Sequence, residues 1–191
     1  LLSGLVSVVR RNLYSGQADI RFFEVGNRYL EGAKGRFPKE ERMLALALSG
    51  EGRAGWLEKK RPPSFYDLKG AVDDLINRLG IRSLEAQAAE HSMFQPDQGV
   101  SLMVKGEAVG FYGTLSDRAR KIFDLEKSFF YAELSLEKIA RHARRAKAVR
   151  EIPKFPASPR DLTLILPEDL KAEKITKRIR HMAPDLVSKI E

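Results

Sequence analysis

The stretch from Pro62 to Gly80 constrains the fold more than any other part of the chain. Pro62 and Pro63 disfavour a helix before them, and Asp67 is a residue type that favours the N-cap position. Apolar residues then follow at the spacing of one helical face: Leu68, Ala71, Val72, Leu75, Ile76 and Leu79. Gly80 suits the position just after a helix, where a left-handed backbone is common. The segment therefore predicts an extended chain that becomes a helix from Asp67 to Gly80.

Upstream of this switch, apolar periodicity predicts one helix and two strands. A helical stripe opens the chain and ends at Ser15-Gly16; it consists of Leu2, Leu5, Val6, Val9 and Leu13. Residues 20–25, except for Arg21 and Glu24, and residues 43–48 are apolar on both faces, which is typical of buried strands. The polar, glycine-containing stretch 31–41 between them predicts a loop, and residues 49–63 form a long connection.

Downstream, the pattern predicts a hairpin, a strand and short helices. Apolar residues alternate over 100–104 and 109–111 around Lys105-Gly106-Glu107, which indicates a hairpin. A short helix is expected over 116–122 and a strand over 129–134, and Ser135 is expected to cap a basic helix.

A run of spaced prolines marks a boundary near residue 150: Pro153, Pro156 and Pro159. Beyond it, Leu162, Leu164 and Leu166 alternate as in a strand, and Ile175, Ile179 and Met182 are spaced as in a helix. The chain is therefore expected to fold as an α+β core over residues 1–150, followed over residues 151–191 by the start of a second domain.

Four motifs occur in the order found in the bacterial phenylalanyl-tRNA synthetase beta subunit. Phe65–Gly70 resembles its FxDLKG element, and Gly106–Leu115 resembles its GxxxGxxGxL strand pair. Phe130–Leu134 is similar to a later strand, and Phe155–Leu166 to the FPxxxRDLxLxL opening of its anticodon-binding domain. The chain departs from the family at two places, where Gln95-Pro96 and Ser116-Asp117 stand for His-Pro.

The resemblance implies a class II aminoacyl-tRNA synthetase-like antiparallel sheet with helices, followed by an incomplete ferredoxin-like domain. It implies the structural and tRNA-binding part of a cytoplasmic phenylalanine–tRNA ligase. The partners implied are a catalytic alpha subunit, in a heterotetramer of two alpha and two beta chains, and tRNA(Phe). ATP and Mg²⁺ are implied for the whole enzyme. The alternative is a free-standing RNA-binding or regulatory paralogue that reuses the same core.

The residues that could carry chemistry do not form a catalytic set. An active class II site uses an Arg-x-Glu pair on one face of a strand, whereas Arg21 and Glu24 are three apart and should point to opposite faces. His91, His142 and His181 lack metal-ligand spacing, and the chain has no cysteine. We therefore expect no catalytic residue, no metal site and no cofactor in this fragment, which alone should be inactive.

A local excess of basic residues is the main hint of a nucleic-acid partner. Residues 134–160 carry eight Lys or Arg and two acidic residues, and such a block suits phosphate contact. The candidate tRNA-binding residues are Lys147, Arg150, Lys154 and Arg160. The alternative interpretation is a solvated surface helix and linker.

The first helix is a candidate subunit interface. Class II synthetases use their first long helix for dimer contacts, so the stripe Leu2, Leu5, Val6, Val9 and Leu13 could contact a second subunit; ordinary core packing is the alternative. The helical pattern begins at the first residue, which is expected of a piece of a longer protein. No apolar run approaches the roughly 20 residues that span a bilayer, so no membrane partner is expected.

Overall fold

The computed structural model describes residues 1–31, 37–52, 55–56, 59–81, 84–144, 156–167, 170, 172–184 and 186–190. The chain forms two compact units, residues 1–147 and residues 148–191.

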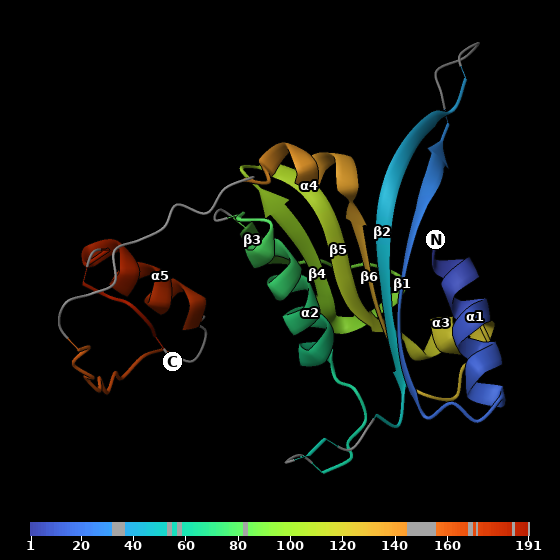
Figure 1. Ribbon diagram of the computed structural model, residues 1–191, viewed down its shortest axis with the longest axis horizontal. Coiled ribbons are helices and arrows are strands. Elements are labelled where there is room, and N and C mark those ends of the chain that lie inside the picture. Colours follow the sequence, from blue (N-terminus) through green and yellow to red (C-terminus); the bar gives the residue numbers. More distant parts are fainter. Residues whose placement is uncertain are drawn as a thin grey trace. The chain divides into compact units, whose positions relative to one another are not determined.

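The first unit is built on an antiparallel sheet whose six strands, within the described residues, lie in the order β1-β2-β6-β5-β4-β3 (Figure 1). Their bounds are β1 Asp19–Leu30, β2 Lys39–Gly50, β3 Leu84–Ala88, β4 Phe94–Val104, β5 Glu107–Leu115 and β6 Phe129–Ser135. Strands that follow one another along the chain pair antiparallel, except for β2 and β3; β2 pairs instead with β6, which lies between β2 and β5. The sheet confirms the expected antiparallel α+β architecture.

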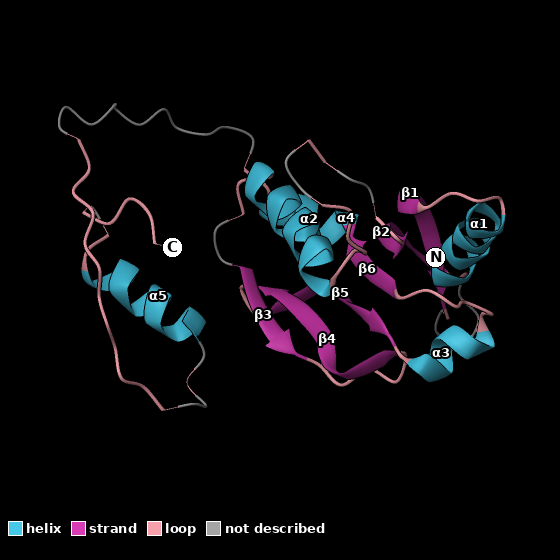
Figure 2. Ribbon diagram, turned by 90° about the horizontal axis from the view of Figure 1, so that it is seen from below, coloured by secondary structure: helices cyan, strands magenta, loops and turns pink. Residues whose placement is uncertain are grey.

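Helices cover both faces of this sheet: α1 Leu2–Tyr14, α2 Phe65–Arg78, α3 Asp117–Ile122 and α4 Leu136–His142 (Figure 2). Alternation along β2 separates two cores. Ala45 and Ala47 pack with residues of α1 and α3, whereas Leu44 and Leu48 pack with residues of α2 and α4. We call these two sides of the sheet the α1 face and the α2 face.

The second unit contains one helix among its described residues, α5 Ala172–Met182. The helix predicted from Ile175, Ile179 and Met182 is confirmed. The strand predicted through Leu162, Leu164 and Leu166 is wrong, because residues 156–167 form no regular structure and Ile165 is 99% exposed. Alternating apolar residues form a strand only where a sheet pairs with them and buries them. The described part of this unit supplies no such sheet, and its ferredoxin-like nature stays a prediction.

Strand β1 differs from its prediction because it lies at the edge of the sheet. It was expected to be buried on both faces, yet Phe23 is 73% exposed and Val25 is 44% exposed. Only its α1 face is covered, so only alternate residues such as Ile20 and Phe22 reach a core. The loop predicted over 31–41 is also shorter than expected, because β1 and β2 stay paired out to Leu30 opposite Lys39.

Helix α2 begins three residues earlier than its sequence pattern predicts. Ser64, with an extended backbone, is the N-cap, and Asp67 is the third helical residue. The earlier start brings the Phe65 ring against Tyr112, with centroids 5.4 Å apart. Gly80 follows the helix with a φ of 71°, as expected. The apolar face is confirmed at Leu68, Val72 and Ile76, which are buried.

Asp67 fixes this helix start through four contacts. Its carboxylate accepts hydrogen bonds from the Ser64 backbone N–H and hydroxyl, both at 2.7 Å. The Arg61 guanidinium donates to the two carboxylate oxygens at 2.6 and 2.8 Å. The Arg61 guanidinium, helped by Ser64, holds the pKa of the Asp67 carboxyl well below its usual range. The carboxylate therefore joins the extended segment to the first turn of α2.

The hairpin between β4 and β5 is confirmed, but strand β3 and the first half of β4 were not predicted. Lys105 and Gly106 have φ values of 51° and 80°, as a tight hairpin turn requires. Strand β3 gives little periodic signal because most of its residues are exposed. The first half of β4 contains Pro96, which lies at a shift in register between Phe94 and Gly99, where a sheet tolerates proline.

Replacing Asp67 by Ala should lower the free energy of unfolding by about 1–2 kcal/mol at pH 7, the usual loss for a helix cap. Because the folded-state pKa is depressed, the contribution is present above the unfolded-state pKa of about 4 and is lost as the pH falls below it. Urea denaturation at several pH values should therefore show the two curves converging in acid. Asp74→Ala, which removes an exposed i,i+4 pair with Arg78, is the control and should cost about 0.5 kcal/mol or less. An undiminished gap at pH 2 would contradict this account.

Two glycines should respond in opposite directions to substitution by alanine. A Cβ at Gly110 of β5 would lie 2.5 Å from the Glu133 carbonyl oxygen of the neighbouring strand, whereas a Cβ at Gly70 of α2 would meet nothing within 4 Å. Gly110→Ala should therefore destabilise the chain by about 1–3 kcal/mol through overpacking. Gly70→Ala should stabilise it by about 0.5–1 kcal/mol through helix propensity. Thermal unfolding of both variants measures the difference, and shifts of the same sign would refute it.

Candidate functional site

Arg21 and Glu24, the residues tested as a class II catalytic pair, lie on opposite faces of β1, as their spacing predicts. Arg21 is exposed on the α2 face, where its Nε lies 3.3 Å from Asp19 Oδ1. Glu24 lies on the α1 face, near Gly4 of α1. The two side chains cannot hold one ligand from the same side of the sheet.

The α1 face instead carries a network of charged residues from three adjacent strands. Arg28 of β1 donates to Glu41 Oε2 of β2 from Nη2 at 2.7 Å and from Nε at 3.0 Å. Its Nη1 lies 3.6 Å from Glu133 Oε1 of β6. The Tyr131 hydroxyl donates to Glu133. Glu41 and Glu133 are both buried, so their charges need these partners.

The pKa shifts in this network favour fixed protonation states. The Ser135 hydroxyl and then Arg28 lower the pKa of Glu41. Burial, followed by the bond to Glu133, raises the pKa of the Tyr131 hydroxyl. A carboxylate held ionised and a phenol held neutral make poor acid–base catalysts near pH 7. The network instead links three strands, because Arg28 of β1 pairs with Glu41 of β2 and with Glu133 of β6.

The sequence interpretation missed this network because its members lie far apart in the chain. Glu41 lies in the stretch 31–41 predicted as a loop, and Arg28 belongs to none of the predicted motifs. One signal was available: Glu133 is the single acidic residue within the apolar strand Phe129–Leu134, and a buried acid requires a partner.

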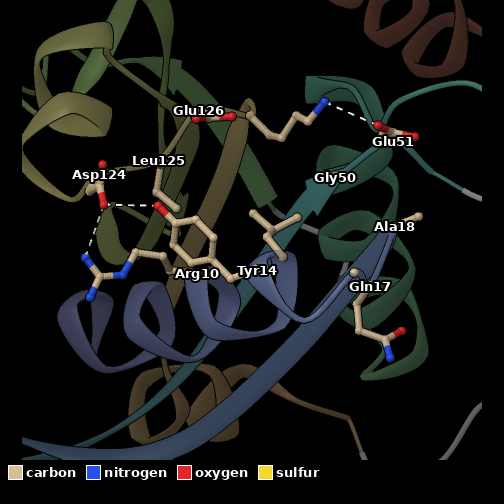
Figure 3. Close-up of a pocket in the computed structure, with 12 residues that line it drawn as sticks. Arg10, Tyr14, Gln17, Ala18, Gly50, Glu51, Asp124, Leu125 and Glu126 are labelled. Atoms are coloured by element: carbon tan, nitrogen blue, oxygen red, sulfur yellow. Dashed lines mark hydrogen bonds and ion pairs between the residues drawn. The ribbon is translucent and has the colours of Figure 1, made fainter.

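A cavity of about 270 Å³ lies where α1 ends, between the start of β1, the end of β2 and the segment after α3 (Figure 3). Tyr14 donates from its hydroxyl to Asp124 Oδ2 at 3.2 Å, and Arg10 Nη1 lies 3.7 Å from the same oxygen. The Asp124 carboxylate raises the pKa of Tyr14. On the other side, Lys127 Nζ lies 3.3 Å from Glu51 Oε1. The Tyr14 and Arg10 contacts join the end of α1 to the segment after α3, and the Lys127 contact joins the segment before β6 to the end of β2.

No group of three metal-ligating side chains occurs among the residues that the structure describes. The His91 ring stacks on Phe111 with centroids 5.4 Å apart. His142 Nε2 lies 3.2 Å from Glu107 Oε2 at the end of α4. Both contacts explain these residues without a ligand.

The four predicted tRNA-binding residues are only partly placed. Lys147, Arg150 and Lys154 lie outside the described residues. Arg160 is exposed, and its Nη1 donates to the Pro159 carbonyl at 2.9 Å. Their contact with tRNA stays a prediction.

The stripe predicted as a subunit interface packs inside the chain itself. Leu5, Val6 and Val9 are buried against the sheet, while Leu2 and Leu13 are partly buried in the same core. Core packing thus explains the apolar stripe of α1. A contact of this helix with another subunit stays a prediction.

The two places where the chain departs from the family motifs, Gln95-Pro96 and Ser116-Asp117, are in contact. Gln95 Nε2 donates to Asp117 Oδ1 at 3.5 Å, and Arg120 Nη2 lies 2.7 Å from the same oxygen. Ser116 still caps α3, accepting a hydrogen bond from the Ala119 N–H at 3.2 Å. These residues therefore form a polar link between β4 and α3.

Among the described segments, no helix is long and apolar enough to cross a membrane.

Comparison with known proteins agrees with this architecture. The family model described as "Phenylalanyl tRNA synthetase beta chain CLM domain" matches residues 1–136. The chain is 31% identical over 193 residues to the phenylalanine–tRNA ligase beta subunit of Pasteurella multocida, covering all of this chain and 24% of that protein. It is 29% identical over 191 residues to the beta subunit of Symbiobacterium thermophilum, covering all of this chain and 21% of the relative. The chain thus spans less than a quarter of the length of these relatives.

A solved structure shows the same fold at lower sequence identity. The pyrrolysyl-tRNA synthetase of Desulfitobacterium hafniense is 16% identical, with a TM-score of 0.52 over 71% of this chain and 46% of that one. This likeness shows a shared fold and nothing finer. The family match extends over residues 1–136 and agrees with the observed sheet and its helices. The chain therefore belongs to the family of phenylalanyl-tRNA synthetase beta chains and contains their CLM domain.

Proposed function

We propose that this chain is the non-catalytic, synthetase-like core of a phenylalanine–tRNA ligase beta subunit, together with the start of an anticodon-binding domain. In this role it supports a catalytic alpha subunit, in a heterotetramer of two alpha and two beta chains, and helps to present tRNA(Phe). The names of the relatives support the subunit assignment. They do not favour the alternative of a free-standing RNA-binding paralogue.

One observation carries the non-catalytic role. The α1 face holds a buried, mutually paired network of Arg28, Glu41 and Glu133, and Arg21 lies on the other face. A site for ATP needs cationic side chains that are aimed at the phosphates, whereas Arg28 is already committed to two carboxylates. We therefore expect ATP and Mg²⁺ to bind the alpha subunit, in the cytoplasm where the ligase works.

The chain alone should give no phenylalanine-dependent ATP–pyrophosphate exchange. Adding the alpha subunit of the same organism to the beta chain, expressed at the full length of its gene, should give exchange. Glu24→Ala in that complex should leave the exchange rate unchanged, because Glu24 lies on the face opposite Arg21 and shares no ligand with it. Exchange by the isolated chain that is lost in Arg21→Ala would show instead that the pair is catalytic.

The basic block should contribute phosphate contacts to tRNA binding. Changing Lys147, Arg150 and Lys154 together to Gln in the complete ligase should reduce the slope of log Kd against log salt by about 0.7–0.9 per lost contact. Phosphate contacts position RNA without reading its sequence, so the loss should be similar for other tRNAs.

A matched control separates position from net charge. Lys69, Arg78 and Lys121 changed together to Gln remove the same charge from α2 and α3, and this variant should keep the wild-type slope. Adenylate formation should be unaffected in both variants. Equal slopes for all three proteins would mean that the block is only a solvated surface.

A further inference from the structure

The connection between β2 and α2 carries the only tryptophan of the chain. Trp56 is 98% exposed, although tryptophan is highly buried on average in folded proteins. A single exposed apolar residue is ordinary on a protein surface, so exposure alone does not make Trp56 a binding residue. The way in which the connection is held, and the charge around Trp56, give the exposure its meaning.

The two ends of this connection are held together, which makes residues 52–61 a closed loop. Gly52 is buried with a φ of 75°, and a Cβ at this position would overlap the Arg61 carbonyl oxygen. Beside this contact, the Lys60 ammonium donates to Glu51 Oε2 at 2.9 Å. Surface loops of this length whose ends meet are frequently functional. We call residues 52–61 the Trp56 loop, and the contact between its ends its neck.

Further contacts fasten the neck to the rest of the first unit. Glu51 Oε1 accepts a hydrogen bond from Lys127 Nζ at 3.3 Å, and the Glu51 backbone N–H donates to the Ala18 carbonyl at 2.6 Å. Arg61 donates two hydrogen bonds to Asp67 in the first turn of α2. A loop that is fixed at its neck loses less conformational entropy when its exposed residues bind a partner.

The surroundings of Trp56 are basic rather than apolar. Residues 52–61 contain four Lys or Arg and one acidic residue, and four minus one gives this loop a net charge of +3. Lys59 is exposed, and Lys127 of the segment before β6 adds a further cation at the neck. A surface with this charge attracts a partner that carries negative charge.

An unpaired RNA segment fits this chemistry better than a protein surface does. In protein interfaces a tryptophan anchor is surrounded by further contact residues that exclude water, whereas the described loop residues nearest to Trp56 in the chain are Gly55 and Lys59. Proteins that bind single-stranded nucleic acid combine a basic surface along the phosphates with aromatic rings on which bases stack. A base-paired stem keeps its base faces stacked inside the helix, so only unpaired nucleotides offer them.

We propose that the Trp56 loop binds unpaired nucleotides of tRNA(Phe), with the Trp56 indole stacked on a base and Lys59 at a neighbouring phosphate. The proposal rests on the proposed function, which gives the ligase a tRNA as its substrate. It assigns an RNA contact to the first unit, in a part of the sequence separate from the basic block over residues 134–160. Unlike phosphate contacts in that block, it requires the exposed face of a base.

The test measures tRNA(Phe) binding by the complete ligase, with the beta chain at the full length of its gene. Trp56→Ala should raise the Kd about tenfold through loss of stacking, and Trp56→Phe should restore most of the affinity, because a phenyl ring still stacks. Neither change removes a charge, so the slope of log Kd against log salt should stay that of the wild type. Lys59→Gln should instead reduce this slope by about 0.7, the value for one phosphate contact with a single strand.

Phe37→Ala and Lys39→Gln are the matched controls. Phe37 is 96% exposed and Lys39 is exposed, but they lie at the start of β2, whereas the Trp56 loop follows its end. Both control variants should bind tRNA(Phe) with the affinity and the salt slope of the wild type. All five variants should keep the wild-type melting temperature, and analytical ultracentrifugation should show unchanged association with the alpha subunit.

A second measurement locates the contact without changing the chain. Ultraviolet irradiation of the wild-type ligase with tRNA(Phe), followed by digestion and peptide mass spectrometry, should give a peptide that contains Trp56 joined to a nucleotide. The nucleotide should come from a loop or a single-stranded end of the tRNA. A crosslink confined to a base-paired stem would contradict the proposal.

The remaining outcomes are distinct. If the wild-type ligase does not bind tRNA(Phe), the proposed function fails, and this inference fails with it. If the wild type binds and Trp56→Ala binds equally well, only the Trp56 contact is overturned. A Trp56→Phe variant as weak as Trp56→Ala would overturn stacking as the interaction. Loss of association with the alpha subunit in Trp56→Ala would assign the loop to a protein partner and overturn the RNA contact.

Discussion

The insertion of β6 between β2 and β5 is the interaction on which the first unit depends. Every residue of β6 is buried, and the strand pairs with partners from two hairpins that are far apart in the chain. At its start, the Ser49 hydroxyl donates to the Ser128 carbonyl at 2.8 Å. Without β6 the two hairpin systems would share no hydrogen bonds, and both cores would lose their centre. Long-range pairing of this kind costs loop-closure entropy before it stabilises the sheet.

The charged network on the α1 face extends this role of β6 to the edge of the sheet. Arg28 connects β1 to Glu41 of β2 and to Glu133 of β6. In a buried setting each of these charges depends on the others, because removing one partner leaves an uncompensated charge. This part of the α1 face is therefore organised for cohesion, as the proposed non-catalytic role requires.

Local patterns predicted the parts of the fold that are themselves local. Helical spacing located α1 and α2, and the Lys105-Gly106 turn located the β4–β5 hairpin. The edge position of β1, the existence of β3 and the partners of Arg28 depend on contacts across the sheet, which periodicity does not contain. The start of α2 was misplaced by three residues, because Ser64 and Asp67 both suit a helix start and the contact of Phe65 with Tyr112 is absent from any local pattern. The alternating leucines at 162–166 gave a strand pattern without a described strand beside them.

Strand β2 places neighbouring residues in different cores, with Leu44 on the α2 face and Ala45 on the α1 face. Inserting or deleting a single residue within 43–49 would exchange the two faces for the rest of the strand and put leucines where alanines fit. Within the β1–β2 hairpin, insertions and deletions during evolution should therefore be confined to the stretch between Leu30 and Lys39. Within β2 itself, natural variation should proceed by substitution, with small side chains kept beneath α1 and larger ones beneath α2.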